Sequence, residues 1–168
     1  IAIRGRSQLP AGANVRVEFD PRAVIRFRLV GYNQSGRDSA PEIGTGQSIT
    51  ALYEVRLRKD AGRAADVATV RVRYASPGDS RQTNDAEKSI TMADISRSWS
   101  AASPRLKLAV LVADWAEMLR RSTFGESIDP RDLAAKAQQL STDFEGEGAV
   151  DEFIALAKRT AMLLGARD

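Results

Sequence analysis

The side chains with the clearest chemical spacing are Asp94, Ser96 and Ser98, which alternate along the segment DISRS. A carboxylate and two hydroxyls are hard oxygen ligands of the kind that Mg²⁺ prefers, and some adhesion domains begin their metal site with this spacing. Such a site also needs an apolar parallel strand ahead of it and ligands from later loops. The 70 residues after Ser98 instead have a helical pattern. We therefore interpret the three residues as a chance motif in a linker with helix-capping chemistry, and we predict no metal site.

Two further segments imitate binding loops. Asp143, Glu145 and Glu147, followed by Gly148, match the start of a calcium-binding loop, but position twelve of that loop, which should be glutamate, is Ile154. We interpret this segment as an acidic turn before a helix.

The second such segment contains Gly44 and Gly46, which invite comparison with a phosphate-binding loop. No Lys-Ser or Lys-Thr follows them, and the next segment has a strand pattern rather than a helical one. We interpret the two glycines as giving the backbone freedom at a tight turn.

The composition narrows the chemistry further. The chain has no histidine and no cysteine, so the usual general base at neutral pH, the commonest metal ligand and any thiol chemistry are all missing. The hydrophobic content of 43% and charged content of 28% are those of a globular protein, and no apolar run reaches the roughly 20 residues of a membrane span. We predict no catalytic residue, no cofactor and no membrane span. A carboxylate-based hydrolase or carbohydrate-active domain is the alternative, because Asp and Glu are plentiful.

Arginines alternate with apolar residues along the predicted strands. The net charge is only +3, divided as +4 over residues 1–96 and −1 over residues 97–168. A basic sheet face is therefore a candidate interaction face, and binding of an anionic polymer is a third hypothesis. Glu18 and Glu54 lie among the arginines and aromatic residues are few, which favours a solvated or ion-paired face and argues against nucleic acid. The candidate face consists of Arg16, Arg26, Arg28, Arg56, Arg58, Arg71 and Arg73.

The first half of the chain has the period of β-strands. Alternation predicts strands over residues 14–20, 25–32, 49–58, 68–74 and, more weakly, 86–92. We expect the first two to be antiparallel neighbours. The third follows the two glycines, and its predicted buried face consists of Ile49, Ala51, Tyr53, Val55 and Leu57.

From about Ser96 the apolar period becomes helical. In a first, central helix Leu108, Leu111, Val112, Trp115 and Leu119 form the apolar side, and the narrow polar side consists of Lys107, Asp114, Glu117 and Arg121. A second helix begins at Asp129 as N-cap with Pro130 next, and buries Leu133, Ala137 and Leu140. A third spans about Ala149–Leu164 and ends before Gly165; its buried side is Val150, Phe153, Ile154, Ala157, Ala161 and Leu164.

These patterns predict an α+β fold, with a small antiparallel β-sandwich of about five strands followed by a three-helix unit packed on it. The sandwich half is residues 1–96 and the helical half residues 97–168. We expect the two halves to form one domain. Because the sequence has no initiator methionine, we expect that domain to be excised from a longer protein.

Several long motifs match a known family. The segments VEFDPRAVIRFRLVGY (17–32) and EIGTGQSITALYEV (42–55) resemble the uncharacterised C-terminal domain that follows a von Willebrand factor type A (VWA) domain in many bacterial proteins. That family has a Val-Glu-Phe-Asn-Pro strand, an Arg-Leu-Ile-Gly-Tyr strand and a Gly-x-Gly-His-x-Val-Thr-Ala-Leu-Tyr-Glu stretch. LAVLVADWAEMLRRSTFGESIDPRDLAAKA also resembles the family's helical half. The resemblance covers about Val15 to Leu164, but Gln47 replaces the usual histidine and the loop 33–41 is shorter than the family's acidic insertion.

The resemblance implies a parent protein that is extracytoplasmic, either periplasmic or on the cell surface, and often lipoprotein-anchored, with an adhesion domain upstream. It therefore implies a non-catalytic accessory domain that supports protein–protein contacts or positions the upstream VWA domain. The expected partners are that VWA domain and a further, unidentified protein.

Overall fold

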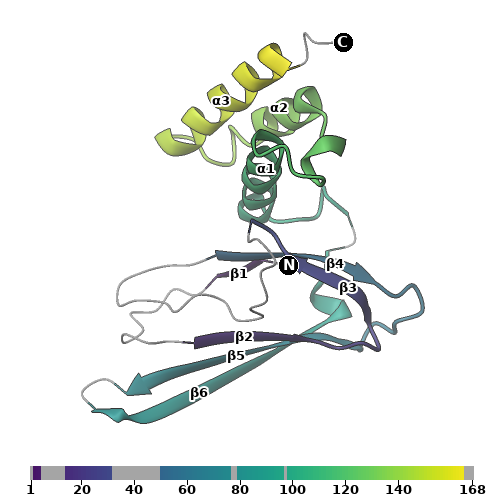
Figure 1. Cartoon of the computed structure of the whole chain (residues 1–168), viewed down its shortest axis with the longest axis vertical. Helices are drawn as coiled ribbons and strands as arrows, with labels where there is room; N and C mark the ends of the chain where they lie inside the picture. Colours follow the sequence, from purple (N-terminus) through teal and green to yellow (C-terminus); the bar gives the residue numbers. More distant parts are fainter. Residues whose placement is uncertain (1, 5–13, 32–49, 77–78, 97, 165–168) are drawn as a thin grey trace. The chain divides into compact units, whose positions relative to one another are not determined.

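The computed structural model describes residues 2–4, 14–31, 50–76, 79–96 and 98–164. The chain divides into two compact units, Ile1–Arg97 and Ser98–Asp168, which we call the sandwich unit and the helical unit. Among the described residues, the sandwich unit holds six strands and the helical unit holds three α-helices (Figure 1). The predicted α+β class, with antiparallel strands in two sheets and three helices, is confirmed.

The sandwich unit consists of two three-stranded antiparallel sheets that face each other (Figure 1). One sheet has the order β1-β4-β3, with β1 over Ala2–Arg4, β4 over Thr50–Leu57 and β3 over Val24–Leu29. The other has the order β2-β5-β6, with β2 over Asn14–Phe19, β5 over Asp66–Ser76 and β6 over Asp79–Thr91. A short 3₁₀ turn, Met92–Asp94, follows β6.

The expected pairing of the first two strands is wrong, because β2 pairs with β5 while β3 pairs with β4. The chain crosses from one sheet to the other at the turn that joins the two strands. The backbone N–H of Arg22 donates to the side chain of Asp20 at 2.8 Å, and the N–H groups of Ala23 and Val24 donate to the Asp20 carbonyl. This tight turn, which Asp-Pro sequences favour, carries the chain from one sheet to the other.

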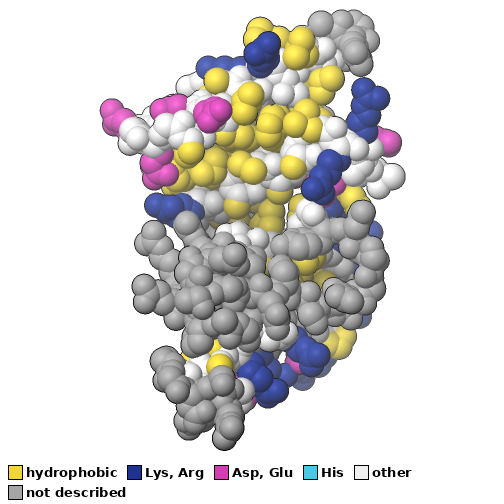
Figure 2. Space-filling model, turned by 60° about the vertical axis from the view of Figure 1, so that its left-hand side comes forward, with side chains coloured by type: hydrophobic (Ala, Val, Ile, Leu, Met, Phe, Trp, Pro, Cys, Tyr) yellow, Lys and Arg dark blue, Asp and Glu magenta, His cyan; other side chains and the backbone are white. Residues whose placement is uncertain are grey.

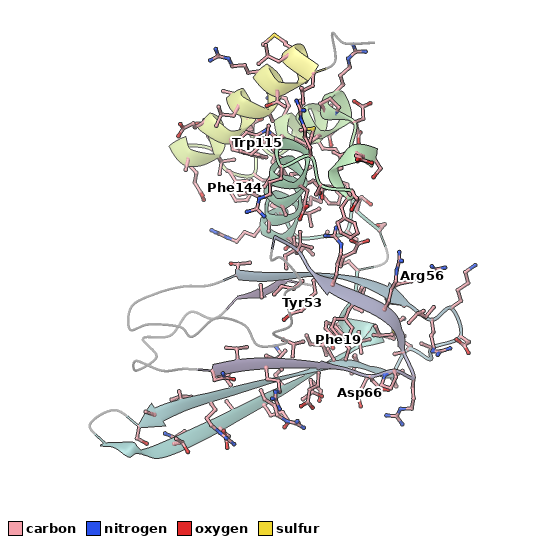
Figure 3. The ribbon with its side chains drawn as sticks, viewed as in Figure 1. Phe19, Tyr53, Arg56, Asp66, Trp115 and Phe144 are labelled. Carbon is pink, nitrogen blue, oxygen red and sulfur yellow. The ribbon has the colours of Figure 1, made fainter. Side chains whose placement is uncertain are left out.

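The buried face of β4 is confirmed for every described residue of the prediction. Ala51 and Tyr53 are buried, Val55 and Leu57 are half-buried, and the intervening Glu54 is exposed; Ile49 lies outside the described residues. Phe19 of β2 contacts this face, with its ring 5.3 Å from that of Tyr53, edge to face (Figure 3). The two sheets therefore share one aromatic core.

The face of β3 is only partly as predicted. Phe27 stacks on Phe19 with ring centroids 4.2 Å apart, yet half of it remains exposed because β3 is an edge strand. Ile25 is 53% exposed, since a register shift between Val24 and Arg26 gives the buried position to Val24 instead. The weak fifth strand is real and longer than predicted, and β1 is an additional strand of three residues.

The helical unit contains α1 over Pro104–Leu119, α2 over Pro130–Gln139 and α3 over Gly148–Leu164, with a 3₁₀ turn at Gly125–Ser127. The predicted start of α2 is confirmed, because the Asp129 side chain accepts from the N–H of Arg131. The shared core is Leu111, Met118, Leu133, Ala134, Ala137, Leu140, Phe144, Val150, Phe153, Ile154 and Ala157. The predicted buried residues of α2 and the central ones of α3 belong to it; Gly165 lies outside the described residues.

The faces of α1 differ from the prediction. Glu117, expected on the polar side, is 8% exposed, whereas Val112 and Leu119, expected in the core, are 42% and 51% exposed. Glu117 is covered because the chain turns back after α1: its carbonyl accepts from the N–H of Ser122, and Gly125 packs against it. The turn after α1 thus buries Glu117, on the side of the helix that the periodicity predicts to face solvent. Val112 and Leu119, on the predicted apolar side, remain exposed to solvent.

Candidate functional site

Two of the three residues of the metal-like motif, Asp94 and Ser98, make local hydrogen bonds. The Asp94 carboxylate accepts from both the backbone N–H and the hydroxyl of Thr91, each at 2.8 Å. These two bonds, the backbone one first, lower the pKa of Asp94. The Ser98 hydroxyl is 3.0 Å from that of Ser100 and accepts from the N–H of Ala101, and Ser96 is exposed. Asp94 therefore caps the turn after β6.

The calcium-loop-like acids lie in the turn between α2 and α3. The Glu147 carbonyl accepts from the N–H groups of Val150 and Asp151 at the start of α3, and its carboxylate lies 3.9 Å from Arg105. Within the described ranges, no group of three or more His, Cys, Asp or Glu side chains could hold a metal ion. The two glycines at 44 and 46 lie outside those ranges.

The seven arginines of the predicted face occupy two outer faces of the sandwich. Arg16, Arg71 and Arg73 lie on the sheet β2-β5-β6, where Arg71 contacts Glu18 at 2.6 Å and Glu87 at 2.8 Å. Arg73 contacts Asp85 at 2.8 Å. This hydrogen bond lowers the pKa of the Asp85 carboxyl. Arg71 and Arg73 are therefore neutralised by cross-strand acids, whereas Arg16, which stands opposite Arg71, forms no ion pair with a described residue.

The other four arginines lie on the outer side of β3 and β4. Arg28 pairs with Glu54 across the strands, and the guanidinium of Arg58 donates to the Pro21 carbonyl at 3.1 Å. Arg26 and Arg56 stand opposite each other in the strand register (Figure 3 labels Arg56). Neither has an ion-pair partner within the part of the chain that the structure describes. Like charges directly opposite each other destabilise a sheet, so this pair of cations is the candidate site for an anionic ligand on the outer side of β3 and β4.

A second surface, which the sequence analysis did not identify, lies on the helical unit. The indole Nε1 of Trp115 in α1 donates to the hydroxyl of Thr160 in α3 at 3.0 Å, and that hydroxyl donates to the Leu156 carbonyl at 2.9 Å. The indole ring also meets Phe153 edge to face, with centroids 5.9 Å apart. These contacts fix the seam between α1 and α3.

Apolar side chains flank this seam on its solvent side. Val112 and Leu119 precede and follow Trp115 by about one helical turn, and Leu156 and Leu163 do the same around Thr160. Their exposed fractions are 42%, 51%, 40% and 65% respectively. We call these four residues the α1–α3 strip. Figure 2 shows how densely hydrophobic side chains gather on the helical unit.

The sequence does contain a signal for this strip. The apolar residues of α1 extend around most of its circumference, more than contact with two other helices can bury. Periodicity alone could not show which of them would remain uncovered. A large exposed apolar patch on a protein commonly marks an interaction site, and these four exposed residues are the candidate for one here.

Comparison with protein families gives one match. Residues 11–163 match the family described as the C-terminal part of the uncharacterised protein YfbK. No curated protein and no solved structure is significantly similar to the chain. Among the described residues, no helix is long and apolar enough to cross a membrane.

Proposed function

The chain belongs to the family of the YfbK C-terminal domain, and from that premise we propose that it is a non-catalytic accessory domain that makes protein–protein contacts. The observation that carries this proposal is the α1–α3 strip, in which four apolar side chains are 40–65% exposed around one part-buried hydrogen bond. A helical unit of this size gains nothing in its own stability from leaving such residues in water. Contact with another protein would bury these apolar side chains and so stabilise the complex.

The motifs at residues 17–32 and 42–55 resemble domains that follow a VWA domain in bacterial proteins. We therefore propose that the parent protein is an extracytoplasmic bacterial protein with a VWA domain upstream of this chain, and that this domain positions it. Cell fractionation of the parent protein tests the compartment. Recovery of that protein in the cytosolic fraction would contradict the proposal.

The contact function is tested by substitutions in the parent protein. Val112→Asp and Leu156→Asp place a charge on the strip without removing a core side chain, so we expect the variants to fold but to lose assembly with other proteins. Lys158→Glu, a charge change at an exposed position of α3 outside the strip, is the control. Native mass spectrometry and size-exclusion chromatography report the assembly. Unchanged assembly of both strip variants would exclude the strip as a contact surface.

A second candidate function rests on Arg26 and Arg56. Their juxtaposition, with no ion-pair partner for either among the described residues, favours binding of an anionic polymer on the outer side of β3 and β4. Binding to a polyanion such as heparin should then weaken steeply with salt, and Arg26→Gln with Arg56→Gln should abolish it. The double substitution Arg71→Gln with Arg73→Gln, on the ion-paired face, is the matched control. Binding that is absent at low ionic strength would eliminate this candidate.

A further inference from the structure

The solvent side of α3 combines apolar residues with unpaired charges. Along this side Glu152, Leu156, Arg159 and Leu163 recur at steps of four, three and four residues. At about 100° per residue, these steps place the four side chains within one narrow sector of the helix. All four are exposed. This sector contains the α3 half of the α1–α3 strip.

The two charges in the sector have opposite signs and no partner within the described residues. They cannot pair with each other, because seven residues of helix separate them by about 10 Å along the axis. Elsewhere in the helical unit, Lys136 pairs with Asp132 and Arg105 lies near Glu147. Glu152 and Arg159 thus place one negative and one positive charge on an apolar surface, and neither has an ion-pair partner among the described residues.

A second α3 that runs antiparallel to the first supplies both counterparts. If a twofold axis passes between Ala155 and Leu156, Glu152 of each copy lies beside Arg159 of the other. Leu156 then lies near the axis and meets its own symmetry mate. Leu163 meets the first turn of the partner's helix at Gly148. A Cβ added at Gly148 would have no atom within 4 Å, so this turn leaves room for the Leu163 side chain. A surface that is complementary to itself about a twofold axis is the form a homodimer interface takes.

We propose that two copies of this chain pair through α3, antiparallel, with Glu152–Arg159 ion pairs on both sides of an apolar centre. This proposal rests on the proposed contact function, and it identifies the contact partner as a second copy of the same chain. The apolar residues drive the association and the charges fix its direction, since complementary charges select register and orientation. Val112 and Leu119 of α1 border the same seam and extend the apolar surface. In the parent protein, such pairing would bring two upstream domains together.

Charge exchange in the 168-residue chain tests the pairing. Glu152→Arg and Arg159→Glu each replace two attractive pairs per dimer with two repulsive ones. We therefore expect sedimentation equilibrium to show dimers weakened at least about tenfold in either variant. An equimolar mixture of the two variants restores both ion pairs and should dimerise about as well as the original chain. Asp151→Arg and Lys158→Glu are matched controls, because they make the same changes one position away, outside the sector.

Circular dichroism establishes that each variant is folded. A chain that stays monomeric at every concentration overturns the pairing. So does a mixture that fails to restore dimers, or a control that weakens them as much as its neighbour does. The proposed contact function fails separately, when the strip variants of the parent protein assemble like the original.

Discussion

Trp115 and Thr160 are joined by a hydrogen bond of 3.0 Å between the indole N–H and the hydroxyl, and this bond links two helices that are otherwise connected through α2. Thr160 is also anchored to its own helix through the Leu156 carbonyl. The bond fixes how α1 and α3 lie against each other. Because the bond sets the arrangement of the two helices, it also sets where the residues of the α1–α3 strip lie on either side of it.

We expect the loss of this bond to destabilise the helical unit. Trp115→Phe removes the donor and keeps an aromatic ring against Phe153, so the free energy of unfolding should fall by about 1–3 kcal/mol, because the Thr160 hydroxyl loses a partner and the ring is smaller. Thr160→Val removes the acceptor instead. Urea denaturation of both variants and of the double variant should show non-additive losses. Strictly additive losses would mean that the two residues do not interact.

The sandwich core depends on Tyr53. Its side chain is 7% exposed and lies against Phe19, so Tyr53→Ala should lower the free energy of unfolding by about 3–5 kcal/mol. Arg56→Ala, three residues along the same strand but exposed, should change it by less than about 0.5 kcal/mol. Denaturant titration measures both. A near-neutral effect of Tyr53→Ala would mean that the buried face of β4 is wrongly assigned.

Gly125 allows the turn after α1 to close over Glu117. A Cβ at this position would lie 2.4 Å from the Glu117 carbonyl oxygen, a contact with backbone that cannot move freely. We expect Gly125→Ala to cost about 1–3 kcal/mol of stability. Gly62→Ala is the control, because its added methyl would meet open space. Equal thermal midpoints for the two variants would contradict this close packing.

Acid should weaken the turn after β6 through Asp94. Hydrogen bonds from Thr91 hold the pKa of this carboxyl below its ordinary value of 3.8. In that pH range the unfolded chain binds more protons than the folded one, so the contribution of Asp94 is present above pH 3.8 and is lost as the pH falls through the folded pKa. Asp94→Asn should flatten the dependence of stability on pH below 3.8, and Thr91→Val should flatten it less. An unaltered slope in Asp94→Asn would contradict this account.

Local patterns predicted much of the fold, and contacts between distant segments account for the errors. Alternation identified the buried face of β4, and the Asp129-Pro130 signal located the start of α2, because both depend on neighbouring residues only. The exchange of sheets between β2 and β3 depends on how the Asp20 turn meets Val67, which no local pattern encodes. The same holds for the burial of Glu117 beneath a later turn.

The candidate surfaces show a similar division. The sequence predicted outward arginines, but it could not assign them to two sheets or match Arg71 and Arg73 with acids on β6, since register is a long-range property. The position of the α1–α3 strip depends on the hydrogen bond between Trp115 and Thr160, which are 45 residues apart in the sequence. The sequence showed that these positions are apolar, but it could not predict that their side chains would be exposed to solvent.

The most direct test of the contact function is site-specific photo-crosslinking in cells that express the parent protein. A photoreactive side chain at Leu119 or Leu163 should form a covalent adduct with another protein chain, while the same group at Lys158, outside the strip, should give little. Mass spectrometry of the adduct identifies the partner, and a second copy of the same chain is the partner we expect. If the strip positions give no more adduct than Lys158, the strip is not a protein contact surface and the central claim is wrong.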